Sequence, residues 1–116
     1  MGDSLALGID LGTSGVRVAV LNQQRELLYT DSTGYRRSLA DPDDWLRSCV
    51  QLITAIPKPF RCRLGAVAVD GTSGTLLACD SEGTPLGKAL PYKVACPEQL
   101  DQVLELVQAG QPAASA

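Results

Sequence analysis

The residue types best suited to chemistry lie near the N-terminus, in the stretch Gly8-Ile9-Asp10-Leu11-Gly12-Thr13-Ser14-Gly15. This stretch joins two apolar runs, residues 5–9 and 16–21, through small residues, hydroxyl groups and one carboxylate. Asp10 comes at the end of the first run, where an oxygen ligand could hold the Mg²⁺ that accompanies bound phosphates. We therefore take Asp10 as a candidate magnesium ligand.

The turn that follows Asp10 has the composition of a phosphate-binding hairpin. Gly12 and Gly15 permit positive φ angles and a close approach of the backbone to a ligand. Their amides, with the hydroxyl groups of Thr13 and Ser14, can form a concave site for phosphate oxygens. The segment is neither a Walker nor a Rossmann loop, because it leads into a second strand rather than a helix. The turn predicts a nucleotide-phosphate site with ATP as the first ligand to test, and an ordinary hairpin turn is the alternative.

A second turn nearly repeats the first. Residues 64–69 are small and apolar, which is typical of a strand buried on both faces. They lead into Asp70-Gly71-Thr72-Ser73-Gly74 and then into a further expected strand over residues 75–79. Ligands in open α/β sheets collect beyond the carboxyl ends of the strands. We expect the two carboxylates and the two hydroxyl-rich turns to meet at one sheet edge.

The remaining elements complete an α/β order of β-β-β-α-β-β-α. The first three strands are expected over residues 5–10, 16–22 and 26–32, with a tight turn at 22–25. A helix is expected to begin after the N-cap Asp41 and to end before Pro57. Its predicted buried face consists of Trp45, Leu46, Cys49, Val50, Leu52 and Ile53.

The C-terminal region is expected to hold one more helix. It begins at Pro97, has an apolar stripe at i, i+3, i+4 and i+7 from Leu100, and ends at Gly110. An exposed stripe of this kind predicts self-association of the isolated chain. Residues 111–116 are expected to be a disordered tail, so the expected domain covers residues 1–110.

Composition limits the class of protein. The 116 residues are 45% hydrophobic, which is enough for a single core. A net charge of −3 argues against nucleic acid or an anionic membrane as a partner, and no apolar run is long enough to span a bilayer. The four cysteines lack the close spacing of zinc ligands and are expected to be reduced, with Cys49 and Cys79 buried. Without histidine the chain has no Ser-His or Cys-His nucleophile. These features predict a cytoplasmic protein.

The sequence resembles the start of an FGGY-family carbohydrate kinase of the xylulokinase-like kind. The likeness rests on Gly-Ile-Asp-Leu-Gly-Thr-Ser-Gly-Val-Arg, on a helix that opens with Asp-Pro-x-x-Trp, and on Asp-Gly-Thr-Ser-Gly-Thr-Leu-Leu-x-x-Asp. It extends over about residues 5–106. The first motif is shared with all actin-like ATPases, whereas the second turn and its spacing make the sugar-kinase resemblance specific. The implied fold is an incomplete ribonuclease-H-like, or actin-like ATPase, domain.

The resemblance implies roles for individual residues. Asp10 corresponds to the catalytic and magnesium-binding aspartate, and Gly12, Thr13, Ser14 and Gly15 to the phosphate hairpin. The segment from Asp70 through Thr72, Ser73 and Gly74 corresponds to the sugar-binding loop. Glycerol kinases carry Gln-Arg-Glu there and typical xylulokinases carry Gln-Met-His, so the small neutral Thr-Ser-Gly argues against glycerol. The expected substrate is a ketopentose such as xylulose or ribulose.

The resemblance implies that the catalytic base and the adenosine loop lie in a second domain, so we expect residues 1–116 to be only the N-terminal part of such a kinase. Phosphoryl transfer needs positioning across a closed cleft, so we expect an isolated N-terminal part to be inactive. One alternative is a non-catalytic nucleotide- or sugar-binding remnant. Another is a ribonuclease-H-like nuclease in which Asp10 and Asp70 hold two metals. That enzyme needs a further inward carboxylate from the first helix, where Asp43 and Asp44 lie only at its start.

Overall fold

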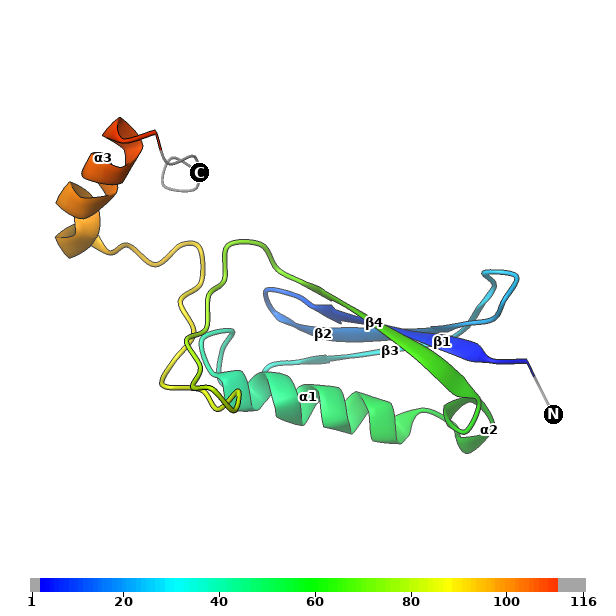
Figure 1. Ribbon diagram of the computed structural model, residues 1–116. Helices are drawn as coiled ribbons and strands as arrows, with labels where there is room; N and C mark the ends of the chain where they lie inside the picture. The colour runs from blue at the N-terminus through cyan, green and yellow to red at the C-terminus, as the bar shows by residue number, and fades with distance from the viewer. Residues whose placement is uncertain (1–2, 111–116) are drawn as a thin grey trace.

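The computed structural model describes residues 3–110 and contains one mixed four-stranded sheet with its longest helix packed on one face (Figure 1). The strands, in spatial order β3-β2-β1-β4, are β3 (Leu27–Gly34), β2 (Gly15–Leu21), β1 (Leu5–Leu11) and β4 (Leu64–Gly71). β1 pairs antiparallel with β2 and parallel with β4. A parallel neighbour requires a long crossover, which here runs through α1 (Pro42–Ala55) and α2 (Lys58–Arg61).

The core lies between the sheet and α1. Alternate residues of β1 and β2 are buried there, with Leu52 and Ile56 from the helix side; the strand residues are Leu5, Leu7, Ile9, Val16, Val18 and Val20. Because successive strand side chains point to opposite faces, Asp10 and its cross-strand partner Arg17 lie on the face opposite α1. Asp70 is in register with Asp10 and shares that open face.

Helix α1 begins as expected and buries a narrower stripe than expected. The side chain of Asp41 accepts a hydrogen bond from the Asp43 amide at 3.1 Å, and Pro42 occupies the first turn. The helix ends at Ala55, before Pro57. The prediction that Leu46 and Val50 are buried is wrong, since they are 67% and 51% exposed. Leu46 and Val50 lie outside the stripe of α1 that contacts the sheet.

β4 is an edge strand, and the prediction that it is buried on both faces is wrong. Val67 and Val69 are 61% and 62% exposed. The reason is the position of α1, which lies over β2 and β3 and leaves β4 uncovered. The apolar character of a strand predicts that it belongs to a sheet, whereas its burial depends on which distant element covers it.

Residues 75–90 form an irregular hairpin in place of the expected strand at 75–79. Leu76 and Leu90 exchange backbone hydrogen bonds of 3.0 and 2.8 Å, and Cys79 forms a single bridge with Pro85. Backbone hydrogen bonds from Leu86 to Ala78 and from Asp80 to Thr84 flank that bridge, but it is out of register with the Leu76–Leu90 bridge, so no continuous ladder forms. Cys79 is exposed, contrary to the expected burial, and Cys49 is half-buried; all four cysteine thiols are free.

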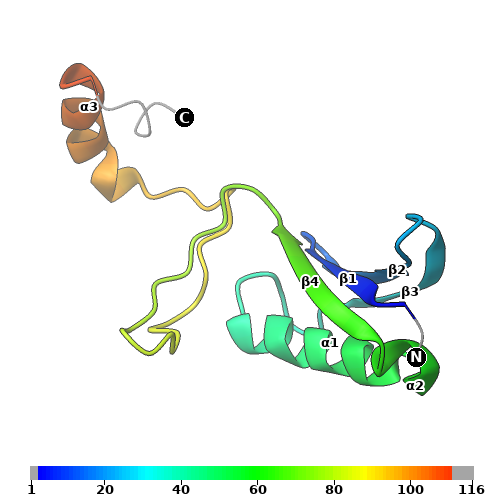
Figure 2. The same ribbon diagram turned by 45° about the vertical axis from the view of Figure 1, so that its right-hand side comes forward.

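The last helix stands away from the sheet in both views (Figures 1 and 2). A short 3₁₀ turn, η1 (Pro97–Gln99), precedes α3 (Leu100–Gln108), and Gly110 ends the helix with φ +79°. The apolar residues of α3 are all substantially exposed, among them Leu100 at 56% and Leu104 at 48%. The expected tail at residues 111–116 lies outside the described residues. No helix within residues 3–110 is both long and apolar enough to cross a membrane.

Candidate functional site

The two Gly-Thr-Ser-Gly turns meet at the carboxyl ends of β1 and β4. The Thr72 amide donates a hydrogen bond of 2.9 Å to the carbonyl oxygen of Leu11. The hydroxyl oxygens of Thr13 and Thr72 lie 3.3 Å apart, within hydrogen-bonding distance. The parallel register of β1 and β4 causes this meeting, because Leu11 pairs with Gly71 at the last position of both strands.

The first turn is a tight connection between β1 and β2. The Gly12 amide donates to the Gly15 carbonyl oxygen at 2.8 Å, while Thr13 and Ser14 are exposed at the tip. Gly15 is needed because a Cβ atom there would lie 2.2 Å from the carbonyl oxygen of Thr33 on β3. The expected close approach at Gly15 is therefore found, and it is to the backbone of β3. The positive φ angle expected at Gly12 and Gly15 is not found there. Among the described glycines it occurs at Gly74, Gly83 and Gly110.

Asp10 and Asp70 lie on the open face of the sheet, opposite α1. A shallow hollow of about 490 Å³ lies there and is lined by both aspartates, by Arg17, and by small residues such as Gly8 and Ala19. Within residues 3–110, no group of three or more Asp, Glu, His or Cys side chains lies close enough to hold a metal ion alone. Mg²⁺ is commonly held by one or two carboxylates together with the phosphates of a substrate. Two carboxylates beside a hydroxyl-rich turn match this donor set.

The second turn presents little side chain to a ligand. Ser73 is exposed, Thr72 is half-buried, and Gly74 has φ +71°. A Cβ atom at Gly74 would lie 2.8 Å from the Cβ atom of Tyr92, which belongs to the segment that returns from the irregular hairpin. Gly74 therefore allows this segment to pass close beside the turn.

Sequence reasoning missed two residues that support the first turn, Tyr35 and Asp44. The Tyr35 hydroxyl donates to the carbonyl oxygen of Gly12 at 2.8 Å, and its amide donates to Ser14 at 3.1 Å. Asp44 is 4% exposed and accepts hydrogen bonds from the backbone amides of Arg36 and Arg37. No local pattern marks Tyr35, because its partners are more than twenty residues away in sequence.

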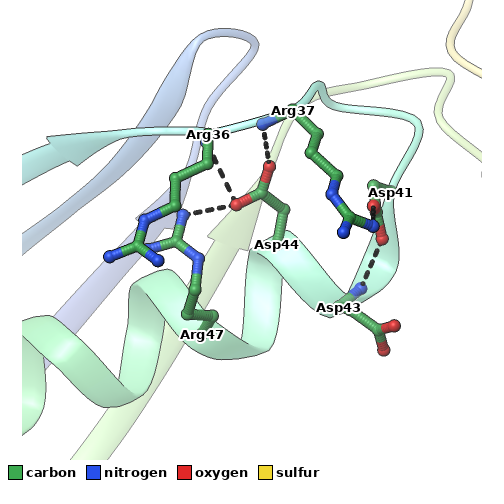
Figure 3. A pocket seen from close by; sticks show the side chains of 6 residues that line it. All are labelled: Arg36, Arg37, Asp41, Asp43, Asp44 and Arg47. Atoms are coloured by element: carbon green, nitrogen blue, oxygen red, sulfur yellow. Dashed lines mark hydrogen bonds and ion pairs between the residues drawn. The ribbon is translucent and has the colours of Figure 1, made fainter.

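Asp44 lies within a pocket of about 280 Å³ formed by three arginines and three aspartates (Figure 3); they are Arg36, Arg37, Asp41, Asp43, Asp44 and Arg47. Burial opposes ionisation of Asp44, but the hydrogen bonds from Arg47 and from the two backbone amides outweigh it and lower the pKa to about 2. Arg37 pairs with Asp41 at 3.1 Å. The Asp44 carboxylate is thus engaged on the α1 side, across the sheet from Asp10 and Asp70. This arrangement argues against the nuclease alternative, which needs a helix carboxylate beside those two.

Comparison with solved structures identifies the fold. A xyloylose kinase from Brucella ovis matches with a TM-score of 0.74 and 19% identity, over 91% of this chain and 25% of that chain. A gluconate kinase from Lactobacillus acidophilus gives 0.73 and 14%, over 95% and 23%. A Plasmodium falciparum glycerol kinase with ADP gives 0.64 and 16%, over 91% and 23%. No protein-family profile matches the sequence.

The chain therefore has the actin-like ATPase, or ribonuclease-H-like, fold, as the sequence predicts, in the form of a partial domain. Its similar structures are sugar and glycerol kinases, and it spans about a quarter of their length. At these identities the likeness establishes the fold alone.

Proposed function

We propose that this chain is the N-terminal part of an ATP-dependent carbohydrate kinase, which transfers a phosphoryl group from ATP to a sugar hydroxyl. The observation that carries the proposal is the meeting of the two Gly-Thr-Ser-Gly turns at the carboxyl ends of β1 and β4, within a fold shared with sugar kinases. This is the edge at which open α/β sheets bind ligands.

In this proposal the first turn binds the nucleotide. The hairpin of Gly12, Thr13, Ser14 and Gly15 offers amides and hydroxyl groups to the phosphates, and Asp10 holds Mg²⁺ beside them. A bound Mg²⁺ would offset the phosphate charge as the phosphoryl group is transferred. Asp70, on the same open face as Asp10, is available as a second oxygen donor or as a support for its own turn. The ADP in the similar glycerol kinase supports a nucleotide in this fold.

The second turn is the proposed sugar site. Asp70, Thr72, Ser73 and Gly74 offer one carboxylate, two hydroxyl groups and an exposed backbone, with no cationic side chain among them. Such a surface suits a neutral polyhydroxylated substrate, and we propose a ketopentose such as xylulose or ribulose. The xyloylose kinase among the similar structures supports this choice.

A second domain is the proposed partner, because one sheet edge is only one wall of a cleft. The chain spans a quarter of the similar kinases, and we propose that the remaining part supplies the catalytic base and the adenosine contacts. Phosphoryl transfer relies on positioning and charge stabilisation across a closed site. We therefore expect the isolated chain to bind without turning over.

Calorimetric titration with ATP tests the nucleotide site directly. The wild-type chain should bind ATP more tightly with Mg²⁺ than with a chelator, and Asp10→Asn should weaken Mg²⁺–ATP binding by more than about tenfold, the value of a lost charged contact. Asp101→Asn is the matched control, because it removes the same charge from the exposed helix α3. Equal Mg²⁺–ATP affinity of the wild type and Asp10→Asn would refute the assigned role.

A non-catalytic nucleotide- or sugar-binding module is the second candidate. The exposed side chains of β4 and α3 fit either candidate function. A second kinase domain could cover them, and so could a different partner. The two candidates differ in turnover. Phosphorylation of xylulose or ribulose by the chain joined to its missing part would establish the kinase.

A further inference from the structure

We propose that Tyr35 is a positioning residue that aims the amide groups of the phosphate hairpin by holding two of its carbonyl groups at once. This inference rests on the proposed nucleotide site and assigns the residue that shapes it. Tyr35 directly follows Gly34, the last residue of β3. Because Gly34 pairs with Gly15 of β2, Tyr35 lies next to the first turn.

The two contacts of Tyr35 lie at alternate residues of the hairpin. Its phenolic hydroxyl donates to the carbonyl oxygen of Gly12 at 2.8 Å, and its backbone amide donates to that of Ser14 at 3.1 Å. In a planar trans peptide the carbonyl oxygen and the following N–H point in opposite directions. No described peptide bond is cis. Carbonyl groups turned toward Tyr35 therefore direct the amides of Thr13 and Gly15 away from it; in the proposed site a phosphate would be bound on that side.

Tyr35 is itself held in place from two sides. Its ring is half-buried against the hydrophobic core. The backbone amides of the next two residues, Arg36 and Arg37, donate to the buried carboxylate of Asp44, which is also bonded to Arg47 (Figure 3). Asp44 thus anchors the segment after Tyr35 to the first turn of α1. The hydroxyl position follows from this anchored backbone and from the packed ring.

The hydroxyl of Tyr35 stays a donor at neutral pH. Burial raises its pKa above the ordinary value of 10.0, and the neighbouring ionisable groups Cys49, Asp10 and Asp44 raise it further. A protonated phenol donates one hydrogen bond, and the Gly12 carbonyl is its acceptor. Removal of the hydroxyl alone therefore releases one of the two carbonyl groups without removing the ring.

Tyr35→Phe tests the role, with Tyr29→Phe as the matched control. Tyr29 lies within β3 and is also half-buried, but its hydroxyl contacts Asp31 at 3.3 Å and Ala55 at 3.5 Å, away from the hairpin. In ligand-free NMR, Tyr35→Phe should raise the mobility and hydrogen exchange of the residue 12–15 amides, and Tyr29→Phe should not. Mg²⁺–ATP affinity should fall about three- to tenfold for Tyr35→Phe only, as expected for one lost hydrogen bond.

Urea unfolding of both variants separates positioning from stability, because each variant removes the hydrogen-bonded hydroxyl of a half-buried tyrosine and keeps its ring. In the wild type, the Tyr35 hydroxyl proton should exchange slowly and show a nuclear Overhauser contact to Gly12. This measurement does not depend on whether a variant folds. Unchanged hairpin mobility in Tyr35→Phe, or a freely exchanging wild-type hydroxyl, would overturn the proposal. A wild type that fails to bind Mg²⁺–ATP contradicts the proposed function instead, while the ligand-free mobility still decides the role of Tyr35.

Discussion

Replacing Gly15 by alanine should disrupt the junction of β2 and β3. An added Cβ atom would lie 2.2 Å from the carbonyl oxygen of Thr33 and 2.8 Å from the Cα atom of Gly34. Both are backbone atoms of a paired strand, so relief requires the strands to separate by about 1 Å to reach ordinary van der Waals contact. That movement also strains the hydrogen bond from the Tyr35 amide to Ser14.

The expected cost of Gly15→Ala is about 2–4 kcal/mol in the free energy of unfolding. It combines about 1–3 kcal/mol for overpacking with about 1 kcal/mol for a weakened backbone hydrogen bond. Urea unfolding followed by far-UV circular dichroism measures this loss. Small domains have only about 5–15 kcal/mol of stability in total, so the shift in midpoint should be large.

Gly8→Ala provides a matched control in the neighbouring strand. A Cβ atom at Gly8 would lie 3.9 Å from the carbonyl oxygen of Ala19, an ordinary contact. Alanine is favoured over glycine within a strand by about 0.5–1 kcal/mol, so this variant should be as stable as the wild type or more stable. A Gly15→Ala chain as stable as Gly8→Ala would refute the argument from close backbone approach.

Two further predictions concern Asp44 and helix α3. The pKa of Asp44 is held at about 2, below its ordinary value of 3.8, so its ionised form stabilises the fold at higher pH and this contribution is lost as the pH falls from about 4 to about 2. Asp44→Asn should flatten that part of the curve of unfolding free energy against pH, and an unchanged slope would contradict the argument. Leu104 lies in the exposed apolar stripe of α3, so Leu104→Lys should lower the concentration-dependent apparent mass in light scattering. A wild-type mass that is monomeric at every concentration would oppose this prediction.

The sequence predicts the parts of this fold that depend on local pattern. The alternating residues of β1 and β2 specify the hairpin and its buried face, and Asp41 with Pro42 specifies the start of α1. It also predicts that the turns after β1 and β4 lie together, because two parallel strands share one carboxyl edge. The roles assigned to Asp10 and to the two turns stay predictions.

Other features depend on contacts between distant segments and could not be predicted. The exposure of Val67 on β4 follows from where α1 lies over the sheet. The segment from Thr75 to Cys79 is apolar enough for a strand, but its two bridges to the returning segment, Leu76 to Leu90 and Cys79 to Pro85, are out of register with each other. Tyr35 reaches the hairpin only because of the β2–β3 register. The sequence around Tyr35 contains no pattern that predicts this register.

The most direct test of the central claim is to locate a bound metal–nucleotide by NMR. Mn²⁺ in place of Mg²⁺ broadens the signals of nearby nuclei, and added with ATP it should broaden the amides of Gly12, Thr13 and Ser14 together with that of Thr72. Asp10→Asn should abolish this broadening. Broadening confined to another carboxylate-bearing turn, such as that at Asp80, or broadening that persists in Asp10→Asn, would contradict the claim that the two turns form one magnesium–nucleotide site.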